Sequence, residues 1–242
     1  CASLDAFRGS IDPFDERVHR VRPHHGQRIV AKRIREIMQG SEILESHRDC
    51  EKVQDPYSFR CAPQVHGAVY ESLLSMQSTI QIELNSTTDN PLVFPSKDGS
   101  PPKIISQGNF HGEILALCAD RMSLSVFELG SISERRMDQL LDPNKSNLPP
   151  FLAKNSGLES GYMIVQYSAG AALSELHGHA SPRTAFSTST SAGQEDHVSM
   201  GATACWNLYQ ACIRLSEVLA CELLIASEAL SSHDYSPSPT VK

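Results

Sequence analysis

The stretch PQVHGAVYESLLSMQSTIQIEL, which runs from Pro63 to Leu84, decides the fold class of this chain. Its apolar side chains recur at intervals of 4, 4, 3, 4 and 4 residues, at Val65, Val69, Leu73, Met76, Ile80 and Leu84. This spacing keeps one face of an α-helix apolar over about six turns of ~3.6 residues each. We therefore predict one long helix here, ended by the turn-forming cluster NSTTDNP at residues 85–91.

Helical periodicity also dominates the rest of the chain. The further helices that it predicts are Gln27–Gln39, Phe110–Leu141, Gly161–Leu176 and His197–Leu230. Strand signals are nearly absent, because apolar and polar residues do not alternate over any sustained run. Helices of this length must bury their apolar stripes against one another. The expected fold class is all-α, a long-helix bundle over residues 1–230 followed by a flexible tail at residues 231–242.

Composition narrows the classes of function. The chain has 242 residues, of which 21 are basic and 28 acidic, and its net charge of −7 argues against binding to nucleic acid or to an anionic membrane surface. No apolar run approaches the ~18 residues of a membrane-spanning helix. None of the seven cysteines forms a Cys-x-x-Cys pair, and several fall within apolar helical patterns. We interpret them as reduced, buried thiols of a cytoplasmic protein.

Three common kinds of catalytic motif do not occur in the sequence. Ten histidines invite a metal ion, but there is neither a His-Glu-x-x-His motif nor a cysteine pair, so no metal is expected. No Gly-x-Ser-x-Gly motif marks a nucleophilic serine. No glycine-rich turn joins a strand to a helix in the way that phosphate binding requires. The remaining chemistry lies in polar clusters at the ends of helices.

The first such cluster, QDPYSFR at residues 54–60, precedes the long helix described above. Pro56 forces a turn, which places Tyr57 and Arg60 close enough to converge on one ligand. The planar guanidinium of an arginine offers two parallel donors that match a carboxylate. The alternative is that Arg60 pairs with a structural carboxylate such as Asp55.

Two more clusters open later helices. In SQGNFHG, at residues 106–112, glycines flank an aromatic residue and either let a ligand approach the backbone closely or form a simple capping turn. In QEDHVSMG, at residues 194–201, Glu195 and Asp196 complement the positive end of a helix dipole, which by itself is no catalytic role.

In their order along the chain, four motifs resemble those of a single enzyme family. The motifs are QDPYSFR at residues 54–60, NSTTDNP at residues 85–91, GNFHG at residues 108–112 and QEDHVSMG at residues 194–201. Together they resemble the histidine, phenylalanine and tyrosine ammonia-lyases and aminomutases, which use a 4-methylidene-imidazole-5-one (MIO) electrophile. The resemblance implies long-helix bundles that form a homotetramer, with each active site assembled from three subunits around an aromatic amino-acid substrate.

The resemblance also implies a role for individual residues. Tyr57 would lie beside the electrophile and the reacting carbon, and Glu195 would help with proton transfer, so these two are the expected catalytic residues. The expected substrate-binding residues are Arg60, which would hold the carboxylate, Asn109, Phe110 and Gln194. These residue types suit an elimination, because removal of a weakly acidic β-proton needs a positioned base and a fixed substrate.

One part of the family pattern does not occur. MIO forms from an Ala-Ser-Gly tripeptide, and these 242 residues do not contain one. We therefore expect the chain to be a C-terminal-half fragment that is inactive without an N-terminal half bearing the electrophile. The glutamate at position 195 resembles that of histidine lyases and bacterial tyrosine aminomutases, and histidine is the favoured substrate. Tyrosine or phenylalanine ammonia-lyase, a 2,3-aminomutase and a non-catalytic helical scaffold are the alternatives.

Overall fold

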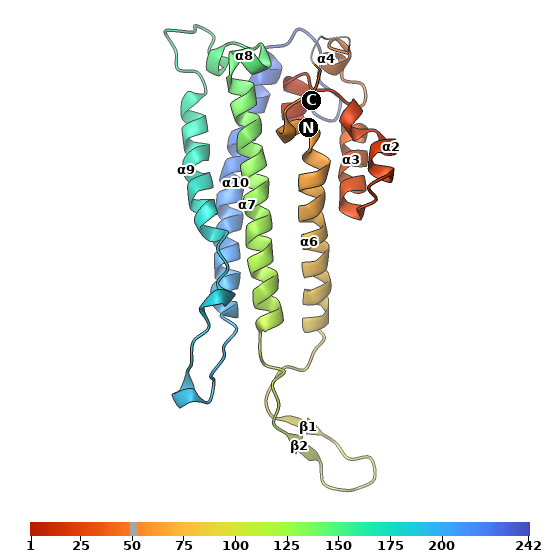
Figure 1. The fold of residues 1–242 in the computed structure, drawn as a ribbon, viewed down its shortest axis with the longest axis vertical. Helices are drawn as coiled ribbons and strands as arrows, with labels where there is room; N and C mark the ends of the chain where they lie inside the picture. Colours follow the sequence, from red (N-terminus) through yellow and green to blue (C-terminus); the bar gives the residue numbers. More distant parts are fainter. Residues whose placement is uncertain (49–52) are drawn as a thin grey trace.

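Four long helices, each antiparallel to the next along the chain, form the framework of the computed structural model, which describes residues 1–48 and 53–242 (Figure 1). They are α6 (Ala62–Glu83), α7 (Glu113–Leu141), α9 (Met163–His179) and α10 (Gly201–Ser231). The central helix, α7, packs against the other three and most extensively against α10. The predicted all-α fold class is confirmed.

Shorter elements cover one end and one side of this framework (Figure 1). The helices among them are α1 (Ala2–Ala6), α2 (Glu16–Arg20), α3 (His25–Ile37), α4 (Glu42–Glu45), α5 (Tyr57–Arg60) and α8 (Pro143–Ser146). Single 3₁₀ turns occur at Asp12–Phe14, Pro150–Leu152, Thr184–Phe186 and Ser191–Gly193. The helix α3 packs directly on α6, where a Cβ added at Gly26 would stand 2.3 Å from the carbonyl oxygen of Gly67. Only glycine fits at so close a crossing.

The predicted long helices match these elements, with two systematic differences. The helices α7 and α10 begin at Glu113 and Gly201, three and four residues after the predicted starts at Phe110 and His197. In both cases the preceding backbone leaves the helical region, and Met200 takes a left-handed conformation with φ of 55°. The residues that resemble family motifs therefore lie in loops just before these helices.

The core lies at the end of the bundle where α1, α5, α7 and α10 meet. Its fully buried side chains include Phe7, Phe59, Met137, Leu140, Val218 and Ile225. The carboxylate of Glu222 is buried beside them. It accepts hydrogen bonds from Ser3 Oγ (2.6 Å) and Ser133 Oγ (2.5 Å) and forms an ion pair with Arg136. Burial alone would raise the pKa of Glu222, but the Arg136 guanidinium and the two hydroxyls together lower it. The pair is therefore ionised and fully hydrogen-bonded inside the bundle.

A small hairpin interrupts the helical pattern. The strands β1 (Leu92–Phe94) and β2 (Lys103–Ile105) pair antiparallel and project beyond the far end of the bundle (Figure 1). Three-residue strands are too short to produce the alternation that the sequence pattern requires, which is why the sequence did not indicate them.

The last residues, 232–242, contain neither helix nor strand and lie against α1 and α4. The Ser238 N–H donates to Asp5 Oδ2 (2.9 Å), and the Ser236 carbonyl accepts from the N–H groups of Glu42 (3.1 Å) and Ile43 (3.3 Å). The segment is thus anchored at two points. The flexibility of residues 231–242 and the extent of the bundle over residues 1–230 stay predictions.

The cysteines only partly match expectation. The six that lie in the described parts of the chain are all free thiols, and Cys50 lies outside the described residues. The prediction that the thiols are buried is wrong: Cys1, Cys205 and Cys212 are exposed, and Cys61, Cys118 and Cys221 are only half-buried. None of the helices in residues 1–48 and 53–242 combines the length and apolarity needed to cross a bilayer.

Candidate active site

Tyr57 and Arg60 form the first half of the candidate site. They belong to α5, a single helical turn that starts directly after Pro56. The guanidinium carbon of Arg60 lies 4.6 Å from the centroid of the Tyr57 ring, a cation–π distance. Both line a cavity of about 430 Å³, with Phe7, Gln54, Asp55, Pro56, Gln139, Asn144 and Lys145. The two side chains lie close together as expected, while their convergence on one ligand stays a prediction.

The hydrophobic core holds α5 in place through Phe59. Phe59 is 1% exposed and stacks on Phe7, with 4.4 Å between the ring centroids. Tyr57, two residues earlier, is 70% exposed. A single turn with one side chain anchored in the core therefore presents the others outward.

Arg60 differs from an ordinary structural arginine. Its Nε is buried, and the described residues offer it no hydrogen-bond partner. Asp55, the structural partner considered above, accepts a hydrogen bond from the Ser10 N–H (2.5 Å). A buried donor without a partner costs about 1–3 kcal/mol, and a carboxylate ligand would supply the missing acceptor.

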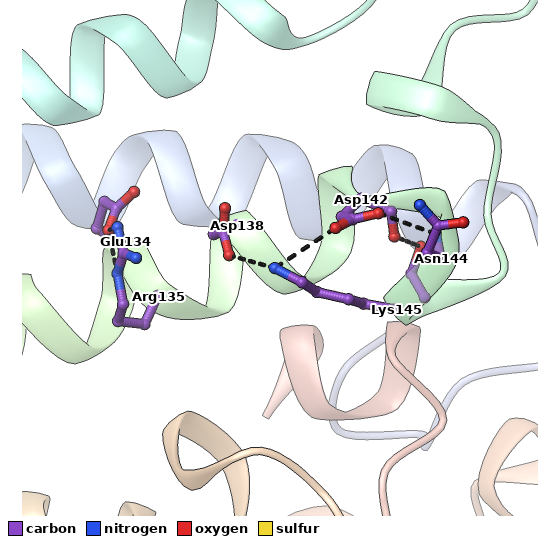
Figure 2. A network of polar contacts seen from close by, with 7 residues as sticks. Glu134, Arg135, Asp138, Asp142, Asn144 and Lys145 are labelled. Atoms are coloured by element: carbon purple, nitrogen blue, oxygen red, sulfur yellow. Dashed lines mark hydrogen bonds and ion pairs between the residues drawn. The ribbon is translucent and has the colours of Figure 1, made fainter.

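The second cation on the cavity wall is already neutralised. Figure 2 shows Lys145 between two carboxylates, with Nζ 2.8 Å from Asp138 Oδ2 and 3.5 Å from Asp142 Oδ2. The hydrogen bond to Asp138 raises the pKa of Lys145. Asp142 also caps α8 by accepting from the Asn144 N–H (2.9 Å). Lys145 therefore stabilises the junction of α7 and α8, which leaves Arg60 as the better anion ligand.

A larger hollow of about 550 Å³ adjoins this cavity across Asp55 and is lined by residues such as Arg8, Ser41 and Arg48. It contains none of the predicted site residues, so its size does not make it the active site.

Phe110 and Glu195 form the second half of the candidate site. They belong to the loops before α7 and α10, which lie at the opposite end of the bundle (Figure 1). Phe110 is 57% exposed in the loop before α7. The exposed Asn109 donates its backbone N–H to the side-chain oxygen of Gln107. Gln194 is exposed in the loop before α10 and donates its backbone N–H to the Ser191 carbonyl (3.2 Å). These loops present their side chains to solvent in the single chain.

The loop that carries Glu195 is closed by Thr190. The two residues exchange backbone hydrogen bonds, and Thr190 Oγ1 donates to Glu195 Oε2 (2.5 Å). The turn between them contains Ala192 and Gly193 with φ of 56° and 89°. The hydroxyls of Thr190 and then Ser191 lower the pKa of the Glu195 carboxyl. The carboxylate is therefore held in one orientation and in its ionised form.

The two halves do not meet within one chain. The helix α7, with its 29 residues, separates the Phe110 loop from the cavity at Arg60. At a rise of about 1.5 Å per residue, that helix is roughly 43 Å long. A site that uses Tyr57, Arg60, Phe110 and Glu195 together needs more than one copy of the chain.

The model of the family described as "Aromatic amino acid lyase" matches residues 1–242. The chain belongs to the aromatic amino acid lyase family. The histidine ammonia-lyase of Myxococcus xanthus is 47% identical over 228 residues, which cover 94% of this chain and 44% of that protein. A histidine ammonia-lyase of Legionella pneumophila is 46% identical over 231 residues, which cover 96% of this chain and 45% of that protein.

Solved lyases and aminomutases share the fold. The histidine ammonia-lyase from Trypanosoma cruzi superposes with a TM-score of 0.85 at 43% identity, over 96% of this chain and 42% of that one. The tyrosine aminomutase from Streptomyces globisporus gives a TM-score of 0.89 at 31% identity, over 99% of this chain and 50% of that one. This chain of the aromatic amino acid lyase family thus spans half or less of the length of these relatives.

Sequence reasoning missed one feature of the second half. His111, Glu113 and His197 gather where the loops before α7 and α10 meet. The two histidines lie in the motifs GNFHG and QEDHVSMG, 86 residues apart. No local spacing rule reveals such a group, because the proximity depends on the pairing of the two helix starts. The shared family motifs were the one available signal.

Proposed function

We propose that this chain forms part of an ammonia-lyase that eliminates ammonia from an aromatic amino acid, with histidine favoured, to give the α,β-unsaturated acid. The observation that carries the proposal is the Arg60 guanidinium, half-buried beside Tyr57 in a cavity, with a buried Nε that lacks a partner in the described residues. The identity of 47% to a histidine ammonia-lyase supports the choice of substrate.

The residues suit the bonds that change. Elimination breaks a Cβ–H bond, whose electron pair forms the new double bond, while the Cα–N bond breaks and the amine leaves as ammonia. Arg60 would bind the substrate carboxylate through its guanidinium fork, which fixes the neighbouring Cα and Cβ. Tyr57, stacked on Arg60, would then face the reacting carbons, and Glu195 would carry a proton at its carboxylate. Phe110, Asn109 and Gln194 would surround the ring and the amine.

Assembly from several subunits is part of the proposal. The separation of the two site halves by the length of α7 supports a homotetramer in which neighbouring chains bring Phe110 and Glu195 to the Arg60 cavity of another copy. Large apolar side chains on the outer faces of the long helices support it too, because burying them between copies is favourable. They include Ile114, Leu117 and Leu124 on α7 and Trp206, Tyr209 and Leu223 on α10.

The electrophile would come from outside these residues. The open cavity, the exposed Tyr57 ring and the unpartnered Arg60 Nε fit a site in which an MIO group lies against the substrate. When present, that group supplies the electron sink for the departing amine. Because Ala-Ser-Gly does not occur in the 242 residues, a second polypeptide segment would have to provide it, and the isolated chain would be inactive. The free thiols fit a cytoplasmic, reducing location.

Fusion to an electrophile-bearing half tests the proposal. The chain would be joined to the N-terminal half of the Myxococcus xanthus relative, and ammonia release would be measured with histidine, tyrosine and phenylalanine. We expect turnover by the fusion but not by the chain alone, fastest with histidine. Arg60→Lys should lower kcat/KM by roughly 10–100-fold, because a point charge replaces a bidentate fork. Arg33→Lys, on the exposed surface of α3, is the matched control.

Each other outcome has a definite meaning. A β-amino acid as the main product would indicate an aminomutase instead. A fusion without turnover, or one whose turnover is unchanged by Arg60→Lys, would favour the non-catalytic scaffold. Turnover by the 242 residues alone would contradict the expected dependence on a second segment.

A further inference from the structure

We propose that His111, Glu113 and His197 bind a divalent first-row transition-metal ion that fastens the Glu195 loop to the start of α7. Each residue offers one ligand atom, and these atoms lie within 4.8 Å of one another. The set combines two imidazoles with one carboxylate, which is a ligand set that zinc and its neighbours favour.

The backbone brings the two loops together before any ion binds. A Cβ added at Gly201, the first residue of α10, would stand 3.6 Å from the carbonyl oxygen of Gly112 and 3.8 Å from the Cβ of Ala116. Ser199 Oγ accepts a hydrogen bond from the Gly201 N–H (3.2 Å) and would stand 3.4 Å from a Cβ added at Gly112. The helix starts therefore touch, and the three side chains project from a packed junction.

The hydrogen bonding of His111 suits a metal ligand. Its Nε2 lies 3.1 Å from the His197 carbonyl oxygen, which can only accept, so Nε2 carries the proton in this contact. A neutral imidazole that donates through one nitrogen keeps the lone pair of the other available. Metal-bound histidines commonly donate their second N–H to a backbone carbonyl in this way. The ring of His197 is close by, with 5.8 Å between the two centroids.

Glu113 supplies an unused oxygen. Its Oε2 is buried, and no described residue forms a hydrogen bond with it. An isolated buried carboxylate oxygen is unfavourable unless a donor or a cation lies against it. The neighbouring carboxylate of Glu195 is not a competing ligand, because Thr190 Oγ1 already donates to it. The unpartnered oxygen therefore points to an ion shared with the two imidazoles.

Binding of an ion requires only small movements of the three ligand side chains. Ligands of a tetrahedral ion at bond lengths of about 2.0–2.1 Å stand roughly 3.4 Å apart. Separations of up to 4.8 Å would close to that value through small rotations of side chains, and both histidines are exposed. Three protein ligands leave at least one position for water. The bound ion would join residues 111–113 to residue 197 and would restrict the loop that holds Glu195.

Metal binding by the chain itself tests this inference independently of any lyase activity. The 242-residue chain, purified without a histidine tag, would be titrated with ZnCl₂ by calorimetry and with CoCl₂ by visible absorption. We expect one tight equivalent of Zn²⁺ and the intense absorption band of tetrahedral Co²⁺. His111→Ala, His197→Ala and Glu113→Gln should each weaken binding at least about tenfold. The control His24→Ala alters one of two adjacent, exposed histidines of the chain and should change nothing.

A second measurement covers variants that fold poorly. Hydrogen exchange of residues 187–199 should slow on addition of Zn²⁺ in the unmodified chain and should not respond in Glu113→Gln, the variant with the least steric change. Absence of Zn²⁺ binding, or binding that the three substitutions leave intact, overturns the proposal. Binding without slower exchange overturns the fastening role.

Discussion

Two arginines at the same end of the bundle differ in how far the described residues satisfy their hydrogen-bond donors. Arg136 is 11% exposed and pairs with Glu222 through Nε (2.5 Å) and Nη2 (2.7 Å). Arg60 has an aromatic ring beneath it and a buried Nε without a partner in the described residues. The first arginine is satisfied within the chain, whereas under the proposed function the second would take its acceptor from the carboxylate of a substrate.

Removal of Glu222 should give the largest effect. Glu222→Ala leaves the buried guanidinium of Arg136 without its carboxylate and takes the acceptor from the hydroxyls of Ser3 and Ser133. Loss of one partner of a buried ion pair costs about 3–5 kcal/mol. We expect the free energy of unfolding, measured in urea, to fall by that amount. Glu217→Ala, which breaks an exposed pair with Arg214, should cost less than about 1 kcal/mol, and equal losses would remove the contrast between buried and exposed charges.

Acid should weaken the same cluster. Burial and the charge of Arg136 lower the pKa of His66 from 6.5 to about 4. Between these values the unfolded chain binds a proton that the folded chain excludes, so the stabilisation is complete above pH 6.5 and is lost as the pH falls toward 4. The loss amounts to at most about 3 kcal/mol. Glu222, whose pKa is lowered, adds a further loss below pH 4.5.

Urea unfolding at pH 7, 5.5 and 4 measures this dependence. His66→Gln removes the titrating group, and its unfolding free energy should vary less over this range than that of the unmodified chain. An unchanged slope in the variant would show that His66 is not the group responsible.

A third substitution tests a polar contact that supports the Glu195 loop. Asp120 on α7 accepts hydrogen bonds from the N–H of Arg183 (2.9 Å) and from the N–H and Oγ1 of Thr184 (2.9 and 2.8 Å). Asp120→Ala leaves these donors unpaired and should cost about 1–3 kcal/mol in chemical unfolding. Asp138→Ala, also on α7, breaks a half-exposed pair with Lys145 and should cost less than about 1 kcal/mol. The reverse order would mean that the loop is held by other contacts.

Most of the helical framework could be predicted from the sequence, because apolar spacing is a local property. The helix α6 begins one residue before the predicted start at Pro63 and ends one residue before the predicted end at Leu84. The starts of α7 and α10 were misplaced because the preceding apolar and aromatic residues continue the pattern while the backbone has already left the helix, as it does at Met200. The pairing of Tyr57 with Arg60 was also predictable, since they stand three positions apart on one turn.

The rest of the site depends on which helix ends meet. Under the proposed function, Phe110 and Glu195 would share a cavity with Arg60 only between copies of the chain, and no spacing within one copy predicts such a contact. The same holds for His111 and His197, whose proximity follows from two helix starts that touch at Gly112 and Gly201. The family motifs identified most of these residues as important without placing them.

The smallest effect on stability is expected where the effect on substrate binding should be large. Arg60→Met keeps the aliphatic packing of the stem but removes the charge and the unpartnered Nε, so the free energy of unfolding should fall by no more than about 0.5 kcal/mol. Arg136→Met, the matched substitution, leaves the buried Glu222 carboxylate without its guanidinium partner. It should lower the free energy of unfolding by about 3–5 kcal/mol. Both are measured by urea unfolding of the 242-residue chain at pH 7. If Arg60→Met were as destabilising as Arg136→Met, Arg60 would be a structural residue with a partner inside the chain. It would then not be available to bind the carboxylate of a substrate.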